Sequence, residues 1–456
     1  MRVLPVVGVS ACLSIGAILV SPARLPAKDT DPNLMAFTDS SGQLRTFSTG
    51  GAIDRDNPFF QNLGTNGRTC VTCHDPSNAW SMTPESLQAR FDASHGLDPV
   101  FHDNDGSICE GVGGFSVADK RKDYGLLLGR GLIRVGLDVP SGAEFIIEHV
   151  DDPNHCGPAS NDASLYRRPL PATNLRFLSA VMWDGREPDL AHQANDATRG
   201  HAQAAQDLSA EQIQQIVDFE SSIYTAQARD NGAGNLDAEG ARGGPVRLSK
   251  ENFFAGINDP VGLNPNGTPF DASAFTIFDS WTKLRSSHDD PMSELRASIG
   301  RGQQIFNTRA FTISGVAGLN GQTFSNGVTV PASISGTCTT CHDTPNAGDH
   351  SVKAPLNIGI SDPDKAPYLP VYTLRNLSTQ ERVKTTDPGR AMITGKWADV
   401  AKFKGPILRA LAARAPYFHN GSAATLEQAV DFYDTRFTIG LTASEKADLV
   451  AFLRAL

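Results

Sequence analysis

One five-residue pattern, Cys-x-x-Cys-His, occurs twice in this chain, at residues 70–74 and 338–342. Two cysteines three positions apart lie near one face of a helical turn, so both can bond to one flat ring system, with the following histidine beneath its centre. In an exported protein this combination is typical of covalent attachment of c-type haem. We therefore expect two sets of attachment residues and proximal iron ligands: Cys70 and Cys73 with His74, and Cys338 and Cys341 with His342.

The same cysteines are open to other chemistry. Four cysteines can bind zinc or an iron–sulfur cluster, and two disulfides can form in an oxidising compartment. Zinc does not require a histidine directly after both cysteine pairs, which favours haem. The pattern does not fix the sixth iron ligand, and that ligand decides function, because a closed iron carries electrons whereas an open iron can do chemistry.

Composition limits the classes of partner. The 456 residues carry a net charge of −10, with 40% hydrophobic and 20% charged residues, which is ordinary for a globular chain of two to three domains. An acidic chain has little with which to neutralise phosphates, so we expect no nucleic-acid partner.

The N-terminus predicts export. Arg2 precedes an apolar run over residues 3–20, and small residues follow it. Residues 1–27 are therefore interpreted as a secretory signal peptide, with an uncleaved anchor as the alternative. We expect a periplasmic protein with no membrane span after processing.

Two cysteines remain once the motifs and Cys12 in the signal are set aside, namely Cys109 and Cys156. In an oxidising compartment they could form a disulfide. Two separate thiols are the alternative, and the sequence leaves both open.

Helix caps predict the elements that position the motifs. Helices are expected after Thr83, over residues 209–228 from a capping box at Ser209, and from Ser293, Thr425 and Thr442. Residues 229–245 are a Gly-rich linker candidate, and residues 310–336 are expected to form a loop or small hairpin. The predicted fold class is mainly α, with two cytochrome c-like haem domains facing each other and extended loops. The expected boundaries are 1–27 for the signal peptide, 45–235 for the N-terminal domain, 236–292 for the linker and interdomain segment, and 293–456 for the C-terminal domain.

Two longer stretches carry a family resemblance. FKGPILRALAARAPYFHNGSAATLEQAVDFY (403–433) and MWDGREPDLAHQANDATRGHAQ (182–203) resemble signature segments of bacterial di-haem cytochrome c peroxidases and their MauG-like relatives. With both haem motifs in the family order, the resemblance covers most of residues 55–456. It implies that the N-terminal haem binds peroxide and that the C-terminal haem receives electrons from a donor protein.

The resemblance also implies roles near the first haem. Trp183 matches a family tryptophan thought to lie near the path between the haems, and Gln193 matches a family glutamine. The family's acid–base glutamate lies 20 residues after that tryptophan, where this chain has Gln203. A glutamine cannot shuttle a proton as a carboxylate does, whereas His201 can near neutral pH. We expect His201 or Gln203 to assist peroxide chemistry, with a loop-packing role as the alternative for His201.

The remaining site expectations also follow from matching positions. Tyr433 stands where the peroxidases have a methionine and MauG-like proteins a tyrosine, so Tyr433 is the expected sixth ligand of the second iron; Met392 is the rival, and a core tyrosine the alternative. In the peroxidases a distal histidine of the first iron lies 16 residues after the proximal one, and in this chain that position is Arg90. Because no histidine stands there, we expect the first iron to be open. The family's interdomain calcium is possible but doubtful, because the matching position is Arg168. His419 matches a family histidine near the interface.

The expected function is that of a periplasmic di-haem c-type peroxidase-like oxidoreductase. It would reduce hydrogen peroxide at the N-terminal haem, with electrons from a small periplasmic donor such as a cytochrome c or cupredoxin. The alternatives are a di-haem electron carrier without an open iron, and a MauG-like oxidase of a protein or organic substrate.

Overall fold

The computed structural model describes Met1 and residues 29–111, 114–156, 162–284 and 290–456. Apart from Met1, the predicted signal peptide therefore lies outside the described residues. Within the described part of the chain, no helix is long and apolar enough to cross a membrane.

The structure combines short helices with several small sheets. The helices are α1 (Pro84–Ser94), α2 (Val117–Asp123), α3 (Gly125–Arg130), α4 (Leu190–Gly200), α5 (Ala210–Ser222), α6 (Pro245–Leu248), α7 (Pro291–Thr308), α8 (Ala391–Thr394), α9 (Leu426–Phe437) and α10 (Ala443–Arg454). The strands are β1 (Thr30–Pro32), β2 (Ala36–Thr38), β3 (Gly42–Ser48), β4 (Ala52–Asp54), β5 (Ile133–Asp138), β6 (Phe145–Asp151), β7 (Asp162–Arg167), β8 (Ile223–Asp230), β9 (Gly234–Asn235), β10 (Phe311–Ser314), β11 (Ser333–Gly336), β12 (Val371–Asn376) and β13 (Arg382–Thr385).

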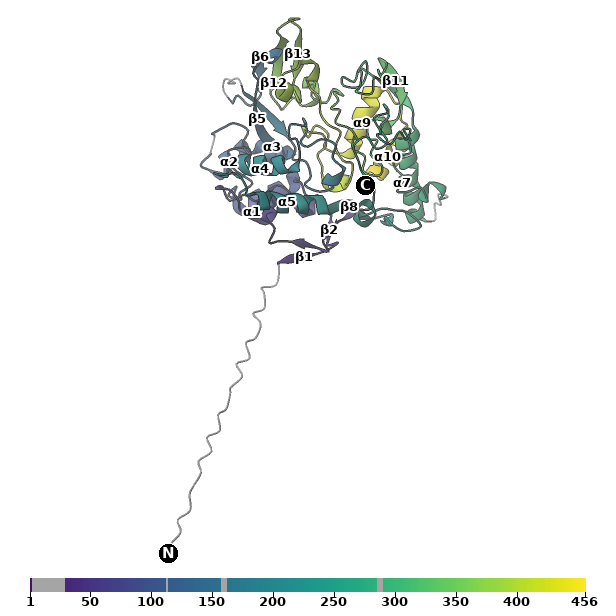
Figure 1. Ribbon diagram of the computed structural model, residues 1–456, viewed down its shortest axis with the longest axis horizontal. Helices are drawn as coiled ribbons and strands as arrows, with labels where there is room; N and C mark the ends of the chain where they lie inside the picture. Colours follow the sequence, from purple (N-terminus) through teal and green to yellow (C-terminus); the bar gives the residue numbers. More distant parts are fainter. Residues whose placement is uncertain (2–28, 112–113, 157–161, 285–289) are drawn as a thin grey trace.

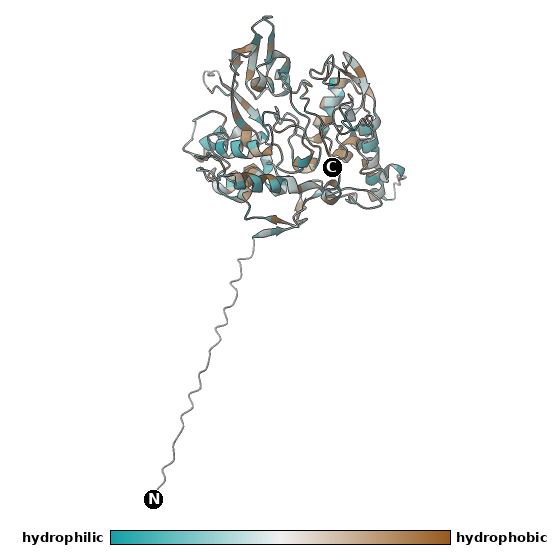
Figure 2. Cartoon of the chain, in the orientation of Figure 1, coloured by the Kyte–Doolittle hydropathy of each residue, from teal (hydrophilic) through white to brown (hydrophobic). Residues whose placement is uncertain are grey.

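The prediction of a mainly α fold is wrong. The chain is 30% helical with 18% strand, and its strands pair in several antiparallel sheets. Burial along β3 alternates residue by residue, which is the period of two expected of a strand with one buried face. Helix caps are local and easily recognised, whereas such short strands become visible only through their partners. Figure 2 shows hydrophobic and hydrophilic residues intermixed along both the helices and the strands.

A four-stranded sheet of order β2-β3-β8-β9 lies beside the first motif. Its strand β8 replaces the last turns of the helix expected over residues 209–228, because α5 ends at Ser222 and Ile223 continues as strand. The β-branched and aromatic residues that follow favour strand geometry. Thr225 on β8 and Thr46 on β3 share a hydroxyl hydrogen bond of 2.8 Å, and Thr46 accepts a hydrogen bond from the Trp80 indole at 2.9 Å. The sheet thereby anchors the segment after the first motif.

A second sheet joins the two halves of the chain. Strand β6 from the first half pairs with β12 from the second, and β13 completes the order β13-β12-β6. Figure 1 shows these strands together at one end of the molecule, with α1 to α5 on one side and α7, α9 and α10 on the other. Buried ion pairs reinforce the junction: Arg167 on β7 binds Asp387 through two nitrogens at 2.7 and 2.9 Å and Asp184 at 2.5 Å.

The C-terminal helices surround the largest apolar cluster. Helix α10 packs along α7, and aromatic rings from Phe275, Phe278, Phe306 and Phe452 meet between them. The predicted helix starts are confirmed, with caps at Thr83, Ser209, Thr425 and Thr442, and the start expected near Ser293 falls at Pro291 after the cap Asp290. The hairpin expected within residues 310–336 is present as the pair β10–β11.

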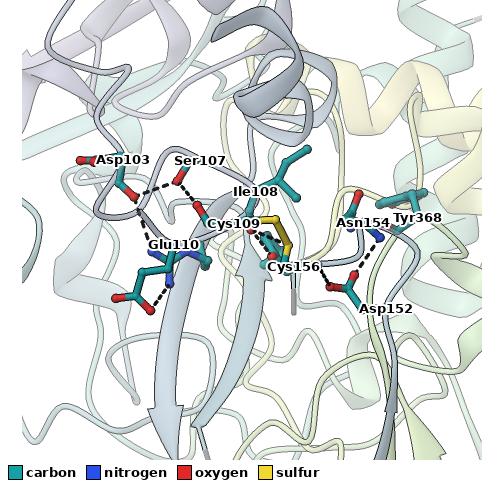
Figure 3. Close-up of a disulfide and its surroundings, with 11 residues drawn as sticks. Asp103, Ser107, Ile108, Cys109, Glu110, Asp152, Asn154, Cys156 and Tyr368 are labelled. Atoms are coloured by element: carbon teal, nitrogen blue, oxygen red, sulfur yellow. Dashed lines mark hydrogen bonds and ion pairs between the residues drawn. A yellow bond between two sulfur atoms is a disulfide. The ribbon is translucent and has the colours of Figure 1, made fainter. Parts of the chain in front are cut away.

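Cys109 and Cys156 form a disulfide that fastens the loop before α2 to the end of β6 (Figure 3). Neighbouring bonds hold the same loop, because Ser107 donates to the carbonyl of Cys109 at 2.6 Å and the Tyr166 hydroxyl donates to the carbonyl of Ile108 at 2.5 Å. The open choice between a disulfide and two thiols is thus settled in favour of the disulfide.

Candidate functional site

The two Cys-x-x-Cys-His motifs fold in the same way. Each forms a short 3₁₀ turn that begins at its first cysteine, over Cys70–Thr72 and Cys338–Thr340. In each, a threonine hydroxyl accepts a hydrogen bond of 3.0 Å from the backbone N–H of the threonine before the motif. This side-chain cap satisfies a donor that the turn would leave free.

The histidine of each motif is fixed by a backbone carbonyl six residues later. His74 Nδ1 lies 3.0 Å from the carbonyl oxygen of Trp80, and His342 Nδ1 lies 2.6 Å from that of Gly348. A carbonyl can only accept, so each Nδ1 carries the proton and each Nε2 keeps a free lone pair. Burial lowers the pKa of His74 to about 4 and also lowers the pKa of His342. Both rings are therefore neutral, which is the form that ligates a metal.

The four motif cysteines are free thiols. Burial raises the pKa of each to between about 11 and about 12. Across the described residues, no three His, Cys, Asp or Glu side chains come together to hold a metal ion. A four-cysteine zinc or iron–sulfur site would need such a group, so the geometry does not fit those alternatives or the pair of motif disulfides.

An apolar cavity lies over the second motif. Cys338, Cys341 and His342 line it on one side, and Tyr433 on α9 lines it too, with Leu426 and Val430 from the same helix. No hydrogen-bond partner of the Tyr433 hydroxyl is found among the described residues, so the bond to a backbone carbonyl expected of a core tyrosine is not made. Burial raises the pKa of this hydroxyl. The rival Met392 lies instead in a cluster with Phe145, Tyr372 and Leu374.

Cationic side chains line part of the same cavity. Lys404 and Arg414 reach it, and the buried Nε of Arg414 has no hydrogen-bond partner among the described residues. Burial lowers the pKa of Lys404 to about 8 and of Arg414 to about 10. Arg414 Nη2 donates to the carbonyl of Ile407 at 2.9 Å, but its buried Nε still lacks an acceptor, and a carboxylate would supply one. An apolar cavity with two thiols, an imidazole and nearby cations fits haem, which is a flat apolar ring with two carboxylates.

Aromatic residues connect this cavity to the first half of the chain. Trp183 lines it and donates its indole N–H to the carbonyl of Arg168 at 2.7 Å. His419 stacks on Phe403 with ring centroids 4.0 Å apart and meets the Trp183 ring edge-on at 6.1 Å. Ser81 also lines the cavity, and it directly follows Trp80, whose carbonyl holds His74. The segment whose carbonyl holds His74 therefore reaches the cavity over the second motif.

The first motif sits against packed aromatic rings. Phe59, Trp80 and Phe219 pack together, and the Phe59 ring lies 6.3 Å from that of His74. Glu220 is buried beside them; burial raises its pKa to about 8, and its Oε2 has no hydrogen-bond partner in the described chain. Its influence on the pKa of Cys70 places it near that thiol. The free lone pair of His74 and the unpartnered Glu220 carboxyl are compatible with bound haem, whose iron accepts a ligand and whose edge carries polar carboxyl groups.

Arg90 stands at the position where the family resemblance places the distal histidine of the first iron, but its side chain is bound to other groups. It donates to the carbonyl of Thr72 inside the motif at 2.7 Å and pairs with Asp98 at 2.6 Å. It therefore braces the motif turn through its backbone.

The three expected catalytic residues on and after α4 are placed differently from one another. His201 follows α4, and its Nδ1 lies 2.6 Å from Asp105 Oδ2. Asp105 in turn binds Arg68 at 2.6 Å. The charge that His201 can carry contributes to the lowered pKa of His74, so the two rings lie within electrostatic range. Gln203 is exposed on a turn with φ of 54°, and Gln193 is half-buried on α4. Asp105 and Arg68 carry no motif and were not predicted.

Arg168 occupies the position that the family resemblance assigns to a calcium ligand. Its guanidinium is 4% exposed and donates to backbone carbonyls from both halves of the chain. Burial lowers its pKa to about 9, with a further contribution from the charge of Arg414, so it remains a cation at neutral pH. A Cβ at Gly131, whose φ is 61°, would lie 2.0 Å from the guanidinium, so glycine leaves it room. The acceptors are the carbonyls of Met82 at 2.7 Å, Arg130 at 3.1 Å, Gly131 at 3.4 Å, Arg414 at 3.1 Å and Ala415 at 3.5 Å.

These carbonyls therefore already face a positive charge that belongs to the protein. A calcium ion needs six to eight oxygen ligands around an otherwise free centre, and a guanidinium among the same oxygens would repel it. The residues present at Arg168 do not fit calcium.

The chain is similar to known cytochrome c peroxidases over part of its length. No protein-family model matches the chain. It is 40% identical over 135 residues to the cytochrome-c peroxidase IdrP2 of Denitromonas iodatirespirans, covering 26% of this chain and 36% of that protein. It is 33% identical over 120 residues to the cytochrome c551 peroxidase of Nitrosomonas europaea, covering 26% of this chain and 30% of that protein. The chain thus matches only about a third of the length of these curated relatives.

A solved structure of a MauG-like protein associated with microbial copper homeostasis aligns with 66% of this chain and 76% of its own, at 19% identity and a TM-score of 0.34. These curated relatives are named cytochrome c peroxidases, which agrees with the peroxidase resemblance predicted from the sequence.

Replacing Arg168 tests whether a side chain fastens the two halves. Arg168→Met leaves five carbonyls without their donor and should lower the free energy of unfolding by roughly 3 kcal/mol or more. Calcium or a chelator should leave the unfolding midpoint of the wild-type holoprotein unchanged. Denaturant unfolding with and without calcium measures both effects.

Arg176→Met is the matched control, because Arg176 is exposed and its loss should change the free energy by less than about 0.5 kcal/mol. A calcium-dependent midpoint in the wild type, or equal losses in the two variants, would contradict this assignment.

Proposed function

We propose that this chain is an exported, periplasmic di-haem oxidoreductase that reduces hydrogen peroxide at its N-terminal haem with electrons passed through its C-terminal haem. One observation carries the proposal: two equivalent Cys-x-x-Cys-His turns each hold a neutral histidine with Nδ1 fixed and Nε2 free. The similarity to cytochrome c peroxidases supports the reaction class.

The chain's own residues would hold the cofactors. Thioether bonds would form at Cys70 and Cys73 and at Cys338 and Cys341, with His74 and His342 as proximal ligands. Bound haem would supply an iron that exchanges electrons and, at the open site, binds peroxide. Lys404 and Arg414 would pair with carboxylates at the second site, where burial and the unsatisfied Nε of Arg414 support that role.

Proton handling at the first site is assigned to His201. Reduction of one hydrogen peroxide to two waters consumes two electrons, supplied by the donor protein, and two protons, supplied by solvent. His201 Nε2 would accept the proton from one peroxide oxygen and deliver it to the other, which leaves as water. The exposed side chain of Gln203 favours His201 for this role, and Gln193 on α4 would contribute a polar contact only.

The second site would store and relay electrons. Tyr433 is its proposed sixth ligand, because it lines the cavity with His342 and its hydroxyl has no other partner in the described chain. Trp183, on the same cavity, would lie on the path between the haems. The electron donor would be a small periplasmic cytochrome c or cupredoxin.

A MauG-like oxidase of a protein or organic substrate is the second candidate. Tyr433 favours it, because the family resemblance assigns a tyrosine at this position to MauG-like proteins. Peroxide would then serve as the oxidant for another molecule.

Low-temperature EPR of the holoprotein tests the assignment of one open iron. One high-spin ferric signal is expected, either in the fully oxidised protein or after addition of one electron, since only an iron without a sixth protein ligand can bind peroxide. Two low-spin signals in both states would make the chain an electron carrier instead.

Removing the proposed proton acceptor tests the role of His201. His201→Ala should slow the reaction with peroxide by about 10²-fold or more, because general acid–base catalysis contributes on that scale. Stopped-flow absorbance of the haem bands measures the rate. His192→Ala, an exposed histidine on α4, is the control and should react at the wild-type rate; a wild-type rate in His201→Ala would remove His201 from the mechanism.

Removing one hydroxyl tests the second site. Tyr433→Phe should change the absorption and EPR spectra of one haem only, because a phenyl ring cannot ligate iron. Tyr417→Phe is the control: Tyr417 lines the same cavity, but its hydroxyl donates to the carbonyl of Leu411 at 2.9 Å. Identical spectra for wild type and Tyr433→Phe would exclude Tyr433 as a ligand.

A further inference from the structure

Three side chains from distant segments form one hydrogen-bonded chain beside the first motif. Arg68, two residues before Cys70, binds Asp105 Oδ1 at 2.6 Å, and Asp105 Oδ2 lies 2.6 Å from His201 Nδ1. Arg68 is 3% exposed and Asp105 is 5% exposed, whereas the His201 side chain is 37% exposed. The buried end of the chain is thus fixed, and the open end is an imidazole.

Arg68 is itself held from several directions. Its Nε donates to the carbonyl of Pro99 at 2.8 Å and its Nη2 to that of Val100 at 2.7 Å. Its Nη1 also reaches the backbone carbonyl of His201 at 3.2 Å, and Asn66 donates to the same carbonyl at 2.8 Å. Both the backbone and the ring of His201 are therefore tied to the segment that leads into the first motif.

The negative charge of Asp105 decides which ring nitrogen of His201 carries the proton. Burial alone would raise the pKa of Asp105, but hydrogen bonds and charge from His201 and Arg68 lower it below its usual range. Asp105 is thus a carboxylate, which can only accept hydrogen bonds. His201 Nδ1 must therefore carry a proton, and in the neutral ring Nε2 is left as the bare nitrogen. Nε2 has no hydrogen-bond partner among the described residues.

We propose that Asp105, held by Arg68, is the positioning residue that fixes the neutral His201 ring in the tautomer with its proton on Nδ1, so that Nε2 serves as the proton acceptor of the first site. The inference rests on the proposed function and deepens it. Neither Asp105 nor Arg68 belongs to a sequence motif. Their role is to hold one tautomer and one orientation of His201, as a buried carboxylate does for a catalytic histidine in hydrolases.

Asp105→Asn separates this role from simple packing. Arg68 requires an acceptor, so the oxygen of the new amide would face Arg68 and its NH₂ group would face His201. Nδ1 would then have to accept, and the proton would move to Nε2, where it blocks proton uptake. The rate constant for the reaction of the holoprotein with hydrogen peroxide should fall by about 10²- to 10⁴-fold.

A second readout follows the ring itself. Diethyl pyrocarbonate acylates an unprotonated imidazole nitrogen, and mass spectrometry of the holoprotein reports the labelling rate at His201. Labelling should be slower in Asp105→Asn than in wild type. Asp189→Asn is the matched control, because Asp189 also binds a histidine Nδ1, that of His192 at 2.8 Å, and Asn keeps its helix-capping role; it should leave the peroxide rate and His201 labelling unchanged.

Epistasis distinguishes positioning from a structural effect. In the His201→Ala background, Asp105→Asn should cause no further loss of rate, because there is no ring left to orient. A further loss there, a wild-type rate in Asp105→Asn, or unchanged His201 labelling would each overturn the proposal.

Asp105→Glu keeps the negative charge that Arg68 needs and serves if the Asn variant does not fold. Its displaced oxygens should reduce the rate by about tenfold or more, and a wild-type rate would again overturn the proposal. If wild-type protein does not react with peroxide, the proposed function fails, while the labelling experiment still decides whether Asp105 sets the state of His201.

Discussion

The hydrogen bond between a motif histidine and a carbonyl six residues later governs the chemistry available at both sites. It fixes the ring, commits Nδ1 to the proton and leaves Nε2 free, and burial keeps the ring neutral. Because this bond is the same at His74 and His342, it cannot distinguish the two sites. Any difference in their chemistry must come from the other residues around each ring.

Those surroundings differ in kind. The cavity beside His342 is apolar, with Tyr433 and buried cations on its lining. Near His74 the structure places a buried acidic group, Glu220, and the chain that ends in His201. The two neighbourhoods are nevertheless mechanically one unit, because Ser81 links them through the backbone and Arg168 and Arg167 bind groups from both halves.

The sequence predicted what is encoded locally. Caps such as Thr83 and Ser209 act on neighbouring N–H groups, so the helices that they start could be recognised. The small sheets depend on partners far along the chain, as in the β6–β12 pair, and the fold class was therefore predicted wrongly. The same limit applies to the site. Asp105 and His201 are 96 residues apart, and no spacing rule connects them. The family resemblance pointed to the position of Arg168, but only the structure shows that its side chain reaches five carbonyls.

The disulfide has a consequence for how the protein matures. Of the six cysteines in the described residues, one pair is joined and four are thiols. Burial holds those four thiols far from ionisation, and only a thiolate attacks a disulfide. Once folded, the chain therefore protects its reduced pairs from scrambling with Cys109 and Cys156. Correct cysteine pairing is therefore protected kinetically by the native packing. Incorrect disulfides can form only before folding buries the motif cysteines.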